Sequence, residues 1–335
     1  MPLMTSRRTL ASTAALLIGL GLAPAANAAI SFEFNYLDPA GFGFNDATNG
    51  TARKNALETS ALQFSNLFSS IFTESGTLTM DVTGSDDSSS STLASAGSAL
   101  VLSGSAPAGF NIGEVVRAKL QTGTDLNDGD ADGTVNVNFG QPWELDLTAT
   151  PSDSQYDFYS TMYHEFFHAL GFASSMSQDG SPVFGDKSAG NWVAFDQFIV
   201  DKNGNPVIDP SSFALNQSTW DAASVGGASP ADGLFFNGSF AVAANSGQPL
   251  GLYSPNPWEG GSSSAHLDDQ NPALAGLMML AATDTGPGAR TLSAVEIGVL
   301  RDIGYTVAAV PEPESYAMML AGLAMLGAIA KRRTR

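Results

Sequence analysis

The chain of 335 residues contains no cysteine, few basic residues and only three histidines. The absence of cysteine excludes disulfide bonds, thiolate metal ligands, a cysteine nucleophile and an inhibitory cysteine switch. An exported chain of this length can nevertheless fold around a hydrophobic core without disulfides. A metal site with nitrogen ligands has to draw on His164, His168 and His266.

Positive charge is scarce, with 14 basic residues against 33 acidic ones. Two basic residues lie near the N-terminus, and four basic and two acidic residues lie near the C-terminus, which leaves eight basic against 31 acidic residues in between. Such a surface repels nucleic acid and anionic membranes. We therefore expect no nucleic-acid partner and an extracellular location.

Residues 1–28 have the organisation of a secretory signal peptide. Arg7 and Arg8 form a basic start, residues 11–22 form an apolar core, and Ala26-Asn27-Ala28 is a cleavage site between small residues. We predict that the mature chain begins at Ala29.

The C-terminal segment 309–335 also has three parts. Val310-Pro311-Glu312-Pro313 precedes an apolar stretch at 316–330, which is shorter than the ~20 residues of a membrane-spanning helix, and a basic cluster follows at 331–335. This order resembles the PEP-CTERM sorting signal of Gram-negative bacteria. The resemblance implies export to the cell surface or medium, recognition by an exosortase-type enzyme and a tail that enters the membrane transiently. The alternative is a simple transmembrane anchor.

Hydrophobic patterns predict an α+β body. Alternation predicts strands at 30–36, 76–82 and 133–139, with shorter strands at 99–102, 194–200 and 206–208; helical spacing predicts helices at 52–72, 112–120, 155–172 and 294–303. A capping box of Ser293 and Glu296 precedes the last helix, and Gly304 ends it. We divide the body into an N-terminal subdomain, 29–172, and a loop-rich C-terminal subdomain, 173–308.

The helix at 155–172 carries the sequence His164-Glu165-Phe166-Phe167-His168. Histidines four residues apart project from one face of a helix, so both imidazoles can bind one Zn²⁺. Glu165 lies beside the pair, where it can act as general base on a water held by the metal, which is the arrangement of the H-E-x-x-H motif. The rest of the helix is strongly apolar, so we expect it to be buried.

A catalytic zinc site needs a third protein ligand. We assign this role to His266, which follows the polar, serine-rich segment 262–264. A carboxylate is the alternative, as in gluzincins, and Glu296 and Asp268 are the candidates.

The motif and its surroundings resemble the metzincin zinc peptidases. Residues 164–171 are similar to the start of the metzincin signature, in which a glycine turns the chain towards a third histidine, although the usual position of that histidine holds Ser174. The leishmanolysin-like branch has a long insertion there, similar in kind to the step from His168 to His266. Its later features also have counterparts in this chain, namely Ser262–Ser264, the Met-turn residue Met278 (alternatively Met279), and Leu300-Arg301-Asp302-Ile303-Gly304-Tyr305.

This resemblance implies a metzincin-like zincin fold. An N-terminal mixed, twisted sheet with a long helix and the zinc helix would precede a loop-rich C-terminal subdomain with a closing helix. Residues 133–139 would then form the edge strand on which an extended peptide substrate pairs.

An acidic loop provides a second candidate metal site. The oxygen-bearing side chains of Asp125, Asn127, Asp128, Asp130 and Asp132 are similar to those of a calcium loop, but Phe139 stands where an EF-hand has glutamate. A single Ca²⁺ and a solvated acidic loop are the two interpretations.

The sequence therefore favours a secreted, zinc-dependent metalloendopeptidase that acts on protein or peptide substrates with Glu165 as general base. Three alternatives remain open. One is a non-catalytic surface or matrix protein with a structural zinc, another is a gluzincin-type hydrolase, and the third is a zinc hydrolase that acts on a non-peptide bond.

Overall fold

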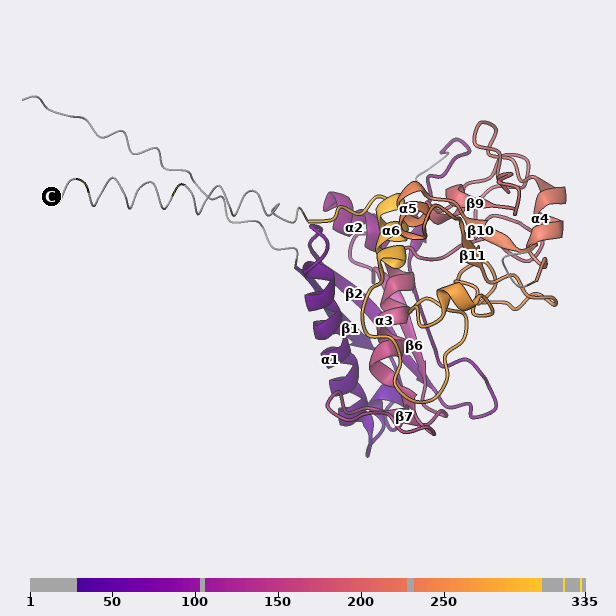
Figure 1. Ribbon diagram of the computed structural model, residues 1–335. Helices are drawn as coiled ribbons and strands as arrows, with labels where there is room; N and C mark the ends of the chain where they lie inside the picture. Colours follow the sequence, from indigo (N-terminus) through magenta and orange to yellow (C-terminus); the bar gives the residue numbers. More distant parts are fainter. Residues whose placement is uncertain (1–28, 103–105, 228–231, 309–321, 323–331, 333–335) are drawn as a thin grey trace, which may run out of the picture.

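The computed structural model describes residues 29–102, 106–227 and 232–308, together with the single positions 322 and 332. The predicted signal peptide and nearly all of the C-terminal tail thus lie outside the described residues. The body is α+β, as the sequence predicted (Figure 1). Its helices are α1 (Gly50–Ser69), α2 (Val115–Thr122), α3 (Phe158–Ala169), α4 (Gln217–Ala223), α5 (Ser239–Ala244) and α6 (Ala294–Asp302), with short 3-10 helices η1 (Gly43–Asn45), η2 (Phe195–Phe198) and η3 (Pro272–Leu274).

The N-terminal part contains a mixed four-stranded sheet with the strand order β1-β2-β6-β3. Its strands are β1 (Ile30–Tyr36), β2 (Gly76–Ser85), β3 (Ala94–Ser98) and β6 (Gly133–Asn138). Strands β1, β2 and β6 run parallel to one another, and β3 runs antiparallel to β6. The prediction that 133–139 forms the sheet edge is wrong, because β6 lies between β2 and β3 and the edge strand is β3. Short pairs β4–β5 (Leu100–Val101, Gly113–Glu114) and β7–β8 (Trp143–Glu144, Tyr156–Asp157) flank the sheet.

One face of this sheet is apolar and covered by helices. Alternate residues on β2 and β6, such as Leu78, Met80 and Val135, are buried, and α1 and α3 pack on the sheet and on each other, as Figure 1 shows in front of β1, β2 and β6. The opposite face carries polar side chains, for example Asn35 and Asp81, which hydrogen-bond across the strands at 3.0 Å. The alternation that predicted the strands thus gives the sheet one buried and one solvated face.

The C-terminal part contains a small antiparallel sheet with the order β11-β10-β9. Its strands are β9 (Ile199–Val200), β10 (Leu234–Phe236) and β11 (Leu250–Leu252). The strand predicted at 194–200 is mostly the 3-10 helix η2, because Phe195 and Phe198 both turn towards Phe236. At 206–208 the structure has only isolated bridges.

The closing helix α6 returns the chain to the N-terminal part. Its predicted capping box is confirmed, with Ser293 Oγ accepting from the Glu296 N–H and the Glu296 carboxylate accepting from the Ser293 N–H. At its other end, Asp302 accepts hydrogen bonds from the Phe240 and Ala241 N–H groups at the start of α5. Beyond α6, the buried Tyr305 hydroxyl donates to the carbonyl of Leu170 at 2.9 Å. The two parts therefore share one continuous hydrophobic core.

The 3-10 helix η2 contains a buried carboxyl group. Asp196 in η2 is 1 % exposed, and its Oδ1 has no hydrogen-bond partner among the described residues. Its Oδ2 accepts from Ser175 Oγ at 3.0 Å. Burial raises the pKa of Asp196 to about 7, with a smaller contribution in the same direction from Glu114, while hydrogen bonds from Ser174 and Ser175 act in the opposite direction.

We predict that Asp196 makes stability fall as pH rises from about 4 to about 7. In this window the folded protein keeps the proton that the unfolded chain has lost, so the contribution is complete below pH 4 and is lost as pH rises through 7. The shift of the pKa corresponds to about 4 kcal/mol at most. In denaturant unfolding, the free energy of unfolding of Asp196→Asn should rise relative to that of the wild type between pH 5 and pH 8. The exposed Asp153→Asn variant is the control, and an Asp196→Asn curve parallel to that of the wild type would contradict the assignment.

Candidate metal centre

Helix α3 is fixed at its N-terminus by Asp157. This residue is 3 % exposed, and its carboxylate accepts hydrogen bonds from the Tyr159 and Ser160 N–H groups in the first turn. Arg290 binds the same carboxylate with two hydrogen bonds of 2.8 Å, and the Gly288 N–H adds another. The N-cap thus also ties the helix to the segment that leads into α6.

The C-terminus of α3 turns at Gly171. This residue has a φ of +105°, and a Cβ there would lie 2.8 Å from Glu114 Oε1, so only glycine fits without strain. The turn brings the Phe172 carbonyl back to His168, whose Nδ1 lies 2.7 Å from it. The glycine of the motif therefore positions the partner of the second histidine.

His266 comes from a loop that is paired on both sides. Leu267 bridges β11 through Leu252 and also bridges Leu280, which directly follows Met279. Its N–H donates to the Met279 carbonyl at 2.8 Å. The loop around His266 is thus held between two other segments, and His266 is only 7 % exposed.

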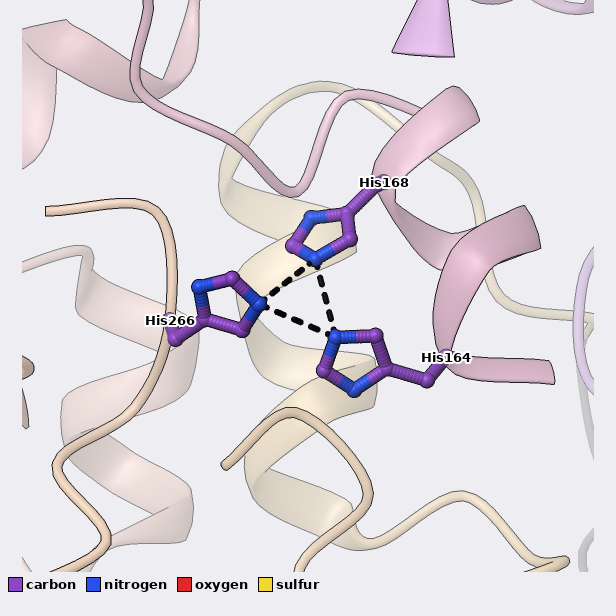
Figure 2. A group of neighbouring side chains, drawn as sticks. All are labelled: His164, His168 and His266. Carbon is purple, nitrogen blue, oxygen red and sulfur yellow. Dashed lines mark hydrogen bonds between the residues drawn. The ribbon is translucent and has the colours of Figure 1, made fainter. Parts of the chain in front are cut away.

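The structure brings His164, His168 and His266 together (Figure 2). Their three Nε2 atoms are 2.9, 3.0 and 3.0 Å apart. Among the described residues, this is the only group of three or more histidine or carboxylate side chains whose ligand atoms lie within 4.8 Å of one another.

Each imidazole is oriented by a main-chain carbonyl. The Nδ1 atoms of His164, His168 and His266 lie 2.7, 2.7 and 2.8 Å from the carbonyl oxygens of Met278, Phe172 and Ser262. Because a carbonyl only accepts, the proton of each neutral ring has to be on Nδ1. The Nε2 atoms then carry only lone pairs, which all point to the same place.

Three lone pairs at this spacing repel one another unless a cation lies between them. Nitrogen ligands about 2.0–2.1 Å from one tetrahedral zinc ion are about 3.3 Å apart, within about 0.4 Å of the observed distances. The three residues therefore fit a zinc ion in number, chemistry and spacing.

Burial keeps the three rings neutral. It lowers the pKa of His164 to about 4 and that of His266 to about 3, and it holds the pKa of His168 well below its ordinary value. Neighbouring imidazoles lower the pKa of His168 and His266 further, while the backbone carbonyls act in the opposite direction. At neutral pH the three imidazoles would thus need no deprotonation to bind a metal.

Glu165 follows His164 on α3 and lies at the free edge of the sheet. It is 6 % exposed, and burial raises its pKa to about 8, while a hydrogen bond with the backbone of Ala96 on β3 lowers it. A carboxyl with a pKa near neutrality can accept and release a proton under physiological conditions.

The two carboxylates considered as a third ligand are not part of the histidine cluster. Glu296 accepts hydrogen bonds from the N–H groups of Met279 and Ser293. Asp268 is 1 % exposed, and its Oδ1 accepts from the Gln270 N–H. Met278 and Met279 are both buried, and the carbonyl of Met278 contacts His164, so the predicted Met-turn lies directly against the cluster.

The acidic loop at 125–132 has a different arrangement. The ammonium group of Lys119 lies 3.1 Å from Asp125 and 3.0 Å from Asp132. Asp132 also accepts from the Thr79 N–H, and Asn127 donates to the Ala131 carbonyl. A lysine thus binds two of the carboxylates proposed for calcium, and no three carboxylates of the loop converge in the described part of the chain.

Sequence reasoning did not find the pair formed by Asp157 and Arg290. Neither residue gave a signal, because the two are 133 residues apart. The carbonyls that orient the histidines are also invisible in a sequence, since every residue has one.

Comparison with known protein families shows that residues 309–333 match the PEP-CTERM protein-sorting motif. The chain carries a PEP-CTERM sorting motif. The prediction for the C-terminus is thereby confirmed, with export, surface sorting in a Gram-negative bacterium and recognition by an exosortase-type enzyme as its implications. No curated protein matches the chain.

None of the helices in the described ranges is both long and apolar enough to cross a membrane. The apolar stretch at 316–330 lies outside those ranges except for residue 322, so its passage through the membrane stays a prediction.

We predict that the full chain binds one Zn²⁺ and that His266→Ala weakens this binding by at least about 100-fold. Loss of a ligand should cost more than the 10–100-fold that is typical for residues that only support a ligand. Competition with a chromophoric chelator measures the affinity. Asp268→Asn is the matched control and should keep the metal. If instead Asp268→Asn released the zinc and His266→Ala retained it, the ligand assignment would be wrong.

Proposed function

We propose that this protein is an exported, zinc-dependent peptide hydrolase, similar to the leishmanolysin-like metzincins. The observation that carries the proposal is the convergence of three neutral imidazoles next to the buried carboxyl of Glu165. The order of helix, long insertion, third histidine and Met-turn supports the finer assignment, since Met278 contacts the first histidine.

The chemistry follows from the positions of the residues. Bound zinc would polarise the scissile carbonyl and make a water molecule more acidic. Glu165 takes the proton of the attacking water and passes it to the nitrogen of the leaving amine. Its raised pKa suits both transfers, and its seclusion from solvent keeps the proton at the site.

The free edge of β3 is the candidate binding surface for the substrate. In the described chain β3 pairs on one side only, with β6. The backbone of Ala96 on this strand hydrogen-bonds Glu165. Backbone groups of alternate residues on an antiparallel edge strand point the same way, so this edge adjoins the catalytic carboxyl. An extended peptide that adds to β3 would bring its backbone to Glu165.

Two observations weigh against a purely structural metal site. Structural zinc sites in proteins usually have four protein ligands, whereas three side chains converge within the described residues. A structural site also gives no role to a buried glutamate next to the ligands. A zinc hydrolase with a non-peptide substrate shares all of these features, and only the free strand edge favours a peptide.

Glu165→Gln tests the proposal. The variant should keep its zinc, because Glu165 is not among the converging side chains, and it should lose at least about 100-fold in hydrolysis of an unfolded protein, as expected for loss of a general base. Zinc content and cleavage are measured on the same sample.

The exposed strand residue Glu33 offers a matched control. Glu33→Gln makes the same chemical change outside the site and should leave both zinc and cleavage unaltered. Undiminished hydrolysis by Glu165→Gln would refute the assigned role. A wild-type protein that binds zinc and cleaves no peptide would favour the non-catalytic or non-peptide alternatives.

A further inference from the structure

Glu296 is fully buried, although it is not one of the converging side chains. It lies in the first turn of α6, where Ser293 and Glu296 cap the helix reciprocally. One carboxylate oxygen accepts from the Ser293 N–H at 2.8 Å. The other accepts from the Met279 N–H at 3.0 Å. Capping therefore uses only half of the carboxylate.

The second carboxylate oxygen of Glu296 binds the peptide group between Met278 and Met279. The N–H of this peptide group donates to Glu296, and its C=O accepts from His164 Nδ1 at 2.7 Å. A carboxylate and a metal-site histidine are thus joined through a single amide. Hydrogen bonds to a charged group are about twice as strong as neutral ones, and bonds in a chain polarise one another by about 10–30 % each.

His266 provides an internal comparison. Its Nδ1 also faces a main-chain carbonyl, that of Ser262, at 2.8 Å. The N–H of that peptide group belongs to Ser263, and it donates to the main-chain carbonyl of Glu259 at 2.9 Å. The chain of hydrogen bonds behind His266 thus ends on a neutral acceptor, whereas the chain behind His164 ends on a carboxylate.

We propose that Glu296 is a positioning residue of the metal centre. It acts on His164 through a relay of two hydrogen bonds, one to each side of the Met278–Met279 peptide group. This inference rests on the proposed function, in that it assigns the three histidines to a zinc ion. The carboxylate fixes the plane of the peptide group and makes its carbonyl a stronger acceptor. A stronger acceptor holds the Nδ1 proton of His164, orients the ring and increases the electron density at Nε2.

The arrangement also couples the closing helix to the metal centre. The same side chain fixes the start of α6 and the Met-turn, so the metal ligand on α3 is supported by an element more than 100 residues away in sequence. The capping box does not require the bond between Glu296 and Met279. In such a box the glutamate side chain binds only the N–H of the N-cap residue, here Ser293.

The test compares Glu296→Gln with Ser293→Ala in the full chain. Glutamine keeps the shape of the side chain, but its amide has only one acceptor atom for the two N–H groups and carries no charge. Ser293→Ala removes the other half of the capping box and leaves the bond to Met279 in place. Two quantities are measured: the dissociation constant for Zn²⁺, by chelator competition, and the NMR chemical shift of each histidine Nδ1 proton.

We expect Glu296→Gln to weaken zinc binding about tenfold, the lower end of the range for residues that support a ligand. The Nδ1 proton of His164 should move upfield, while that of His266 stays in place. Ser293→Ala should change zinc binding by less than about twofold and leave the His164 proton unmoved, because the relay is intact. If Glu296→Gln changes neither quantity, or if Ser293→Ala changes both to the same extent, the relay does not exist.

The Nδ1 proton shifts of the wild-type protein test the proposal even if Glu296→Gln does not fold. The relay predicts that the Nδ1 proton of His164 resonates downfield of that of His266, and the reverse order contradicts it. This comparison needs neither zinc nor peptide cleavage. Failure of the proposed function, seen as absent zinc binding or absent hydrolysis, is therefore distinguishable from failure of the relay.

Discussion

The central constraint of this structure is that three neighbouring imidazoles direct unprotonated nitrogens at one point. Main-chain carbonyls fix the proton of each ring on Nδ1, and burial keeps the rings neutral. Three lone pairs about 3 Å apart repel one another. A cation that shares the site, as we propose, would remove this repulsion and give Glu165 a chemical role.

Much of the surrounding architecture positions these three side chains. Asp157 and Arg290 clamp the start of α3, the turn at Gly171 sets the partner of His168, and the double pairing of Leu267 places His266. Each contact joins segments that are distant in sequence. The site is therefore a property of the assembled body, whereas the PEP-CTERM motif at 309–333 is a local signal at the end of the chain.

The sequence predicts those elements whose pattern is strong. Clear alternation identified β1, β2 and β6, and helical spacing identified α1, α3 and α6. The edge strand β3 was missed because Ala94 to Ser98 contain only small residues with little strand preference. Helices α4 and α5 are too short to show a period, and the order of strands in the sheet depends on tertiary packing. This is why β6 was wrongly placed at the edge.

Candidate site residues were easier to find than their surroundings. His164, Glu165 and His168 stand out by spacing, and His266 by being the one other histidine. From the sequence, Glu296 was also a candidate metal ligand. In the structure its carboxylate instead accepts hydrogen bonds from the Met279 and Ser293 N–H groups. A sequence indicates which side chains have suitable chemistry, whereas the route by which one acts on another depends on backbone groups that every residue has.

X-ray absorption spectroscopy of the zinc-loaded protein tests the central claim most directly. The account predicts a four-coordinate zinc with three imidazole nitrogens at about 2.0–2.1 Å and one oxygen ligand from water. A spectrum with two imidazoles, or with a shell of oxygen ligands alone, would contradict it.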